Sequence, residues 1–70
     1  MRIAWVRPFT KGYSELEPIN FKLNLKTGDL IKYERENGSI SIGQIRSVCD
    51  GKVDSETRVI AVYREEKYND

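Results

Sequence analysis

Residues 19–48 constrain the fold more than any other stretch, because strand signals and turn signals alternate along them. Every second position of residues 19–25 is apolar, and this two-residue period is typical of a strand with one buried face. Two turn signals follow, Gly28-Asp29 and Asn37-Gly38, and glycine adopts the positive φ angle that tight turns often need. The stretch therefore predicts a small antiparallel β-domain.

Strand signals extend over most of the chain. We expect five strands, at residues 2–6 or 2–7, 19–25, 29–35 or 30–35, 39–49 and 58–64, with loops at residues 10–18 and 50–57. Residues 59–63 also fit a helical period, but their β-branched side chains favour a strand. In the fourth strand, Ile40 and Ile42 share one parity and Ile45 has the other, which predicts a bulge or bend at Gly43.

Five short strands joined by tight turns predict an all-β fold, a small five-stranded antiparallel barrel or roll. A Src-homology-3-like barrel is favoured by the hairpin at Asn37-Gly38 and by the bent fourth strand, and an OB-like barrel is the alternative. Residues 1–64 are expected to form a single domain, and residues 65–70 a charged tail that frays. A domain of 70 residues buries only about 60% of the surface of its unfolded chain.

The composition argues against catalysis and against secretion. Histidine is absent, the single Cys49 leaves no internal disulfide, and no phosphate-cradling or zinc-binding motif is present. We therefore expect no enzyme, no catalytic residue, no metal and no cofactor, with Cys49 buried as a small hydrophobic residue. The lone cysteine and the lack of a signal-like or spanning apolar run predict a cytoplasmic, soluble chain.

Binding is the remaining class of function. Aromatic residues are many for so short a chain, and we expect Trp5 and Phe21 in the core, and Tyr33 and Tyr13 nearer the surface. A nucleic-acid surface would combine Tyr33 with nearby basic groups, the candidates being Arg7, Lys11, Lys22, Lys32 and Arg35. A protein-binding patch would use Phe9, Tyr13 and Leu16. The net charge of +1 gives little support to nucleic-acid binding.

Two motifs in residues 21–48 resemble a known family. Leu25-Lys26-Thr27-Gly28-Asp29-Leu30-Ile31 and Ser41-Ile42-Gly43-Gln44-Ile45 are similar to the HAS-barrel, the N-terminal β-barrel of HerA-type DNA-translocating ATPases. The chain also resembles the polymerase-suppressor C-terminal domain of YaaT-type proteins and the N-terminal DNA-binding domain of the primosomal replication-restart helicase. The resemblance implies docking, assembly or binding in nucleic-acid machinery, and it carries over no catalytic residue.

The expected function is a non-catalytic interaction module, an assembly or docking component of a nucleic-acid-processing system. Its expected partner is another protein, with self-association as one form. The alternative is a small barrel that binds DNA or RNA directly, and such binding would weaken steeply with salt. No membrane partner and no small-molecule substrate are expected.

Overall fold

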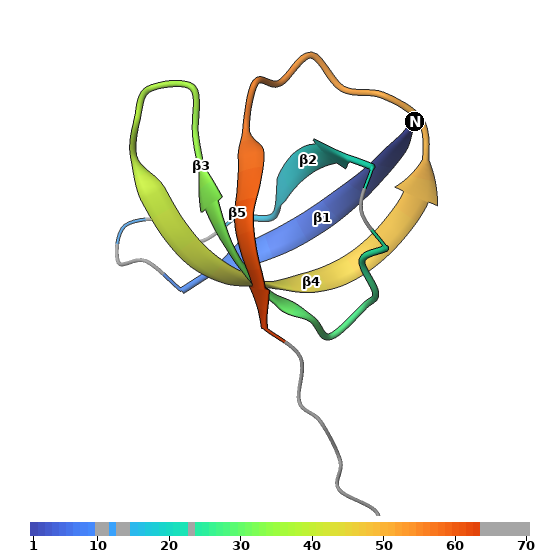
Figure 1. Ribbon diagram of the computed structural model, residues 1–70, viewed down its shortest axis with the longest axis horizontal. Coiled ribbons are helices and arrows are strands. Elements are labelled where there is room, and N and C mark those ends of the chain that lie inside the picture. Colours follow the sequence, from blue (N-terminus) through green and yellow to red (C-terminus); the bar gives the residue numbers. More distant parts are fainter. Residues whose placement is uncertain (10–11, 13–14, 23, 64–70) are drawn as a thin grey trace, which may run out of the picture.

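Five antiparallel strands form one curled sheet. The computed structural model describes residues 1–9, 12, 15–22 and 24–63 (Figure 1). The strands are β1 (Arg2–Pro8), β2 (Glu17–Phe21), β3 (Leu30–Glu34), β4 (Ile40–Asp50) and β5 (Arg58–Tyr63), in the sheet order β2-β1-β4-β3-β5. The described residues contain no helix, so the predicted all-β class and antiparallel strand pairing are confirmed. The predicted tail at residues 65–70 lies outside the described residues.

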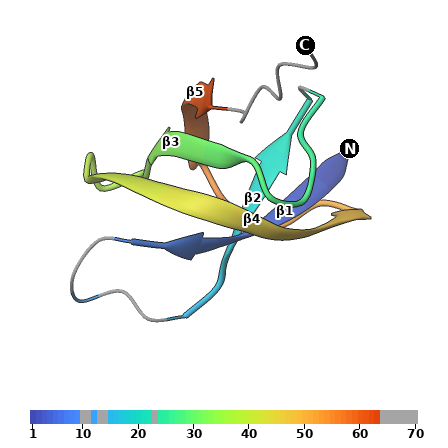
Figure 2. The ribbon, with the colours of Figure 1, turned by 90° about the horizontal axis from the view of Figure 1, so that it is seen from below.

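The sheet forms a half-barrel around one core. Its two edge strands, β2 and β5, approach each other, although no ladder joins them in the described part of the chain (Figures 1 and 2). The concave side holds the buried side chains, which are Ala4, Val6, Ile19, Phe21, Leu25, Ile31, Tyr33 and Ile45. Burying one large aliphatic or aromatic side chain stabilises the fold by about 1.5–3 kcal/mol, so this cluster is the main source of stability.

The turn before β3 is fixed both internally and to β4. The amide of Asp29 donates to the carbonyl of Lys26 over 3.1 Å, and Gly28 has a φ angle of 97°. Hydrogen bonds of 2.8 and 2.9 Å then join Gly28 and Asp29 to the backbone of Ile45. The turn signal at Gly28 is confirmed, and the turn is held against the longest strand of the sheet.

The β3–β4 connection is a tight hairpin. The amide of Gly38 donates to the carbonyl of Arg35 over 2.9 Å, and the amide of Arg35 donates to the carbonyl of Ser39 over 2.8 Å. Gly38 has a φ angle of 86°, as a glycine has at the left-handed position of a three-residue hairpin loop. The hairpin predicted from Asn37-Gly38 is confirmed.

The bulge in β4 lies at Arg46, so its predicted position at Gly43 is wrong. Trp5 pairs with Ser47 but Val6 pairs with Ile45, which leaves Arg46 without an opposite residue on β1. The pairing of β4 with β3 stays regular through Gly43. The prediction assumed that all the isoleucines of this strand face inward. Instead, Ser41, Gly43 and Ile45 face the core, while Ile40 and Ile42 face outward.

The lack of space beside Gly43 explains the glycine. A Cβ atom there would lie 2.7 Å from the carbonyl oxygen of Arg7 and 2.7 Å from Cγ1 of Val6. Real Cβ contacts are longer than this, so a side chain at this position would have to push β1 away from β4. Gly43 therefore marks a close approach of two strands.

Strand β2 starts earlier and ends earlier than predicted. It spans Glu17–Phe21, so its first two residues come from the segment predicted as a loop, and Leu25 is buried outside any strand. Pro18 is tolerated because β2 is an edge strand and one row of its amides has no ladder partner.

Of the burial predictions for Trp5, Phe21 and Cys49, one is confirmed and two are wrong. Phe21 is buried in the core, as predicted. Trp5 is only half-buried, because Ala4 and Val6 occupy the inward positions of β1 and Trp5 faces the other side. Cys49 is exposed near the end of β4, beyond the bulge that changes which parity faces inward.

A side chain on β2 holds the β4–β5 loop. Nδ2 of Asn20 donates to the carbonyl of Val53 over 2.6 Å, and the amide of Val53 donates back to Oδ1 of Asn20 over 2.9 Å. The Asn20 amide thus forms the kind of paired contact that a neighbouring strand would make. The loop is held beside β2 in this way.

Replacing Asn20 should loosen this loop. We expect Asn20→Ala to lower the free energy of unfolding by about 1–2 kcal/mol, because the Val53 backbone groups lose their partner. Chemical denaturation measures this loss, and amide hydrogen exchange should show faster exchange at Val53. Lys52→Ala, in the same loop but exposed, is the matched control. An equal effect of the two substitutions would contradict the role assigned to Asn20.

Candidate functional site

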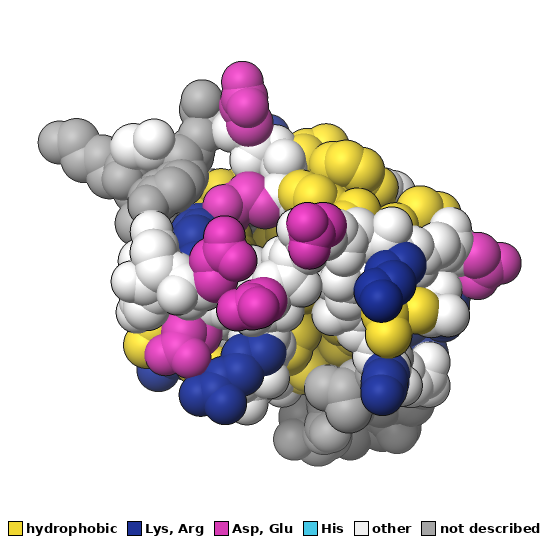
Figure 3. Space-filling view, turned by 90° about the horizontal axis from the view of Figure 1, so that it is seen from above, with side chains coloured by type: hydrophobic (Ala, Val, Ile, Leu, Met, Phe, Trp, Pro, Cys, Tyr) yellow, Lys and Arg dark blue, Asp and Glu magenta, His cyan; other side chains and the backbone are white. Residues whose placement is uncertain are grey.

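The strongest candidate site is the convex side of β3, β4 and β5. Inward side chains such as Ile31 and Tyr33 alternate with outward ones, and many of the outward ones are large and apolar. We call this surface the outer face, and its apolar members are Phe9, Leu30, Ile40, Ile42, Ile60 and Tyr63, each 36–59% exposed. A space-filling view from another side also shows apolar side chains lying in patches beside charged ones (Figure 3).

The strand register places apolar and charged side chains of the outer face next to one another. Ile42 lies opposite Lys32, and Leu30 lies opposite Tyr63. Side chains directly opposite each other on one face have Cβ atoms about 4.5–5.5 Å apart, so these residues are neighbours. The amide of Phe9 donates to the carbonyl of Ile42 over 2.8 Å and so holds Phe9 beside β4. Phe9, Lys32, Ile40 and Ile42 line a shallow hollow of about 360 Å³.

The outer face carries both signs of charge on one strand. Lys32 is half-buried among the apolar side chains and makes no ion pair with any described residue. Glu34 lies two residues further along β3 and pairs with Arg58 over 3.1 Å. A surface of apolar groups around two cations and one carboxylate, in which one cation is already paired with the carboxylate, suits contact with a protein better than contact with a polyanion.

A polar cluster joins β2 to the β3–β4 hairpin at one end of the core. Arg35 makes two hydrogen bonds to the carboxylate of Glu17, of 2.7 and 2.6 Å, and a third of 2.7 Å to the hydroxyl of Ser41. The hydroxyl of Tyr33 also donates to Glu17. The side chains of Arg35 and Glu17 are 10% and 26% exposed, so their charges are partly removed from water.

The hydrogen bonds and the burial of this cluster shift the pKa values of two of its groups. The hydrogen bonds from Arg35 hold the pKa of Glu17 below its ordinary value of 4.5, against the opposing effect of burial. Burial, with the hydrogen bond to Glu17, raises the pKa of Tyr33. The carboxylate and the guanidinium are therefore charged and paired internally. The cluster connects strands and leaves little charge to attract a ligand.

The candidate nucleic-acid residues are not gathered on one surface, and the two that meet, Tyr33 and Arg35, do so inside the fold. Tyr33 was expected near the surface, and this is wrong, because its side chain is fully buried and its hydroxyl is used by Glu17. Arg35 is committed to the same cluster. Arg7 is exposed on β1, Lys32 lies on the outer face, and Lys11 lies outside the described residues.

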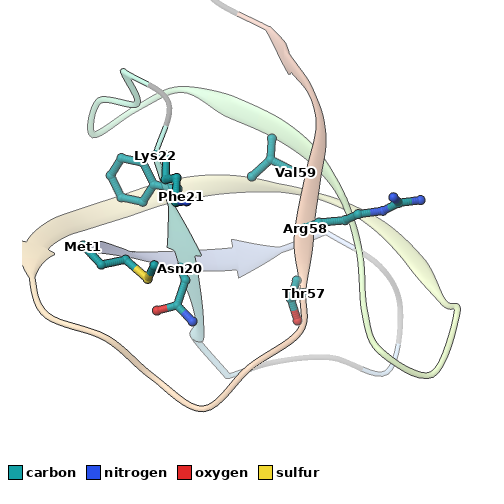
Figure 4. Close-up of a pocket in the computed structure, with 7 residues that line it drawn as sticks. All are labelled: Met1, Asn20, Phe21, Lys22, Thr57, Arg58 and Val59. Atoms are coloured by element: carbon teal, nitrogen blue, oxygen red, sulfur yellow. The ribbon is translucent and has the colours of Figure 1, made fainter.

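Lys22 lies at a different cavity, between the ends of the two edge strands. This cavity has a volume of about 290 Å³ and is lined by Met1, Asn20, Phe21, Lys22, Thr57, Arg58 and Val59 (Figure 4). The guanidinium carbon of Arg2 lies 5.4 Å from the centre of the Phe21 ring, within the range of a cation–π contact. Lys22 and Lys32 thus belong to separate hollows.

The predicted protein-interaction residues are also divided. Phe9 is exposed and belongs to the outer face. Leu16 is exposed in another hollow, lined by Arg7, Leu16, Arg46 and Ser47, and Tyr13 lies outside the described residues.

The apolar residues of β3, β4 and β5 that make up most of the outer face were missed as site residues. One signal for them was present in the sequence. Leu30, Lys32 and Glu34 share a parity on one predicted strand, and Ile40 and Ile42 share a parity on the next. The structure places Lys32 opposite Ile42 and Glu34 opposite Ile40.

The described residues add neither a metal-binding cluster nor a membrane-spanning helix. They hold no group of three acidic or cysteine side chains placed to bind a metal ion. They also contain no helix with the length and apolarity needed to cross a bilayer. Comparison of the chain with protein-family models, with curated proteins and with solved structures gave no match. The class that the fold defines is a small all-β half-barrel of five antiparallel strands.

Proposed function

We propose that this chain is a non-catalytic interaction module that docks onto another protein chain through the outer face. One observation supports the proposal, the group of exposed apolar side chains on three neighbouring strands of a small domain. Contiguous apolar patches on a soluble protein commonly mark interaction sites. The expected partner surface is apolar and presents opposite charges to Lys32 and Glu34.

The wider setting is proposed from the resemblance of residues 21–48 to the HAS-barrel. On that basis the module serves as an assembly or docking component of a nucleic-acid-processing system in the cytoplasm. A Src-homology-3-like barrel is proposed over an OB-like one, and the tight β3–β4 hairpin and the bulged β4 strand support that choice. Direct binding of DNA or RNA has less support, because two of its six candidate residues are engaged inside the fold.

The proposal is tested by a single substitution on the outer face. The tagged protein and its Ile42→Lys variant are used to capture partners, and a purified partner is then titrated with both. We expect Ile42→Lys to weaken binding by at least about tenfold, since it places a charge in the apolar patch. Lys52→Glu, a charge change in the exposed β4–β5 loop, is the control and should leave the affinity unchanged.

Thermal denaturation of both variants shows whether the fold is retained. Ile42 points away from the core, so its replacement should change the melting temperature little. Equal affinity of the wild type and Ile42→Lys for every partner would rule out the outer face as the docking surface.

A further inference from the structure

We propose that the outer face binds a second copy of this chain, face to face and with β3 strands antiparallel, so that Lys32 of each copy meets Glu34 of the other. The inference deepens the proposed function, because it names the partner of the same surface. It rests on three observations: the spacing of two opposite charges on β3, the register of β4 beside them, and the cation among apolar groups that has no ion pair with a described residue.

The charges on β3 are self-complementary. Lys32 and Glu34 are two residues apart on one strand, so both side chains point outward from the same face of the sheet. Consider two sheets stacked face to face and related by a two-fold axis that lies between them. The axis is perpendicular to the β3 strands and passes them at the level of residue 33. It places residue 32 of one chain over residue 34 of the other, and the reverse contact follows by symmetry. Two Lys–Glu pairs form from one pair of residues per chain.

The same axis also pairs the apolar residues of β4. Ile42 lies opposite Lys32 in the sheet, and Ile40 lies opposite Glu34. An axis that superimposes residue 32 on residue 34 of the second copy therefore brings Ile42 to the level of Ile40 of that copy. Both isoleucines are 44–48% exposed and would be covered. The register thus brings charge to opposite charge and apolar group to apolar group in a single arrangement.

The charges favour a second copy over an unrelated partner. In the single chain, Lys32 has no ion-pair partner among the described residues, although it is half-buried by its neighbours. Glu34 has one partner, Arg58, whose side chain is 75% exposed and remains free to keep this contact. Removal of Lys32 from water without a carboxylate would be costly. The second copy supplies that carboxylate at the required spacing.

The dimer is expected to be weak. Strand β3 has five residues and is about 17 Å long, so the contact lies at the small end of protein interfaces. We expect a monomer–dimer equilibrium that requires a protein concentration on the order of 100 µM, which is typical of small transient interfaces. Sedimentation equilibrium over a range of concentrations measures this dissociation constant directly.

Charge exchange between two variants tests the arrangement. Lys32→Glu places a second carboxylate against Glu34 of the other copy, and Glu34→Lys places two ammonium groups together, so each variant alone should dimerise at least about tenfold more weakly. An equimolar mixture restores opposite-charge contacts, and its association should return to within about threefold of the wild type. The double variant Lys32→Glu/Glu34→Lys should also dimerise. Lys52→Glu controls for net charge.

The outcomes separate this inference from the proposed function. The homodimer is overturned if the wild type stays monomeric at 1 mM, roughly ten times the expected dissociation constant. It is also overturned if the equimolar mixture of Lys32→Glu and Glu34→Lys associates no more than either variant alone. Weaker binding of a different protein by Ile42→Lys would still support the docking function in that case. Circular dichroism and thermal unfolding of each variant exclude loss of the fold, since both substituted side chains point away from the core.

Discussion

Gly43→Ala is expected to lower the free energy of unfolding by about 3 kcal/mol. The added methyl group would lie 2.7 Å from the carbonyl oxygen of Arg7 and from Cγ1 of Val6, and a backbone oxygen in a ladder cannot turn aside as a flexible side chain can. A domain of this size has a total stability of roughly 4–10 kcal/mol, so the variant would keep only part of it. Urea denaturation followed by tryptophan fluorescence provides the measurement.

Gly38→Ala separates steric overlap from backbone strain. Gly38 has a φ angle of 86° but open space around its Cα, so alanine there should cost only the strain of the left-handed conformation, about 1–2 kcal/mol. Gly43 has no such φ angle, and its cost should come from the contact alone. If Gly43→Ala proved no more destabilising than Gly38→Ala, the close approach of β1 and β4 would not limit this position.

Glu17→Gln is expected to be the second most damaging substitution, with a loss of about 2–3 kcal/mol. It removes the charge that balances Arg35, whose side chain is only 10% exposed, and it weakens the hydrogen bonds that Glu17 accepts. Breaking one side of a buried ion pair is costly because the other charge stays buried without its counterion. The expected loss is smaller than for a fully buried ion pair, because the side chain of Glu17 is partly exposed to solvent.

This substitution should also change the dependence of stability on pH. The pKa of Glu17 is lowered in the folded protein, so its contribution is complete above the ordinary value of 4.5 and is lost as the pH falls toward the folded value. The free energy of unfolding, measured by denaturation at several pH values between pH 7 and about pH 3, should therefore fall less steeply for Glu17→Gln than for the wild type. Glu56→Gln, an exposed carboxyl in the β4–β5 loop, should leave the profile unchanged.

The paired variant Glu17→Leu/Arg35→Met distinguishes charge from packing. Glu17→Leu alone leaves the charge of Arg35 without a counterion. The double variant removes both charged groups, so it should be more stable than Glu17→Leu alone. A double variant no more stable than that single variant would contradict the ion pair as the reason for the loss.

Local signals in the sequence were sufficient to predict the strands and turns. The glycines at positions 28 and 38 occupy the turns predicted for them, because the ability to adopt a positive φ angle without strain is a property of glycine itself. The inward direction of β4 was harder to predict. Hydrophobicity placed Ile40 and Ile42 inside, but the inner positions belong to Ser41, which bonds Arg35, and to Gly43, which the neighbouring strand crowds.

The outer face was missed as a site because the inward direction of β4 was predicted wrongly. Once Ile40 and Ile42 are assigned to the core, no apolar surface remains on β4 to be noticed. Tyr33 was assigned to the surface because its hydroxyl needs a partner, but Glu17, far away in sequence, supplies one inside the fold. Such partners depend on the tertiary fold, and a single sequence does not show which distant carboxylate will meet which hydroxyl.

The exposed thiol of Cys49 has a practical consequence for anyone who purifies this chain. With no second cysteine in the sequence, oxidation in air can join only one molecule to another. Such covalent pairs would form even from molecules with altered surfaces elsewhere, and they would imitate association on a sizing column. A reductant in every buffer, or alkylation of this one sulfur, prevents disulfide-linked pairs, so that any association that is still measured is non-covalent.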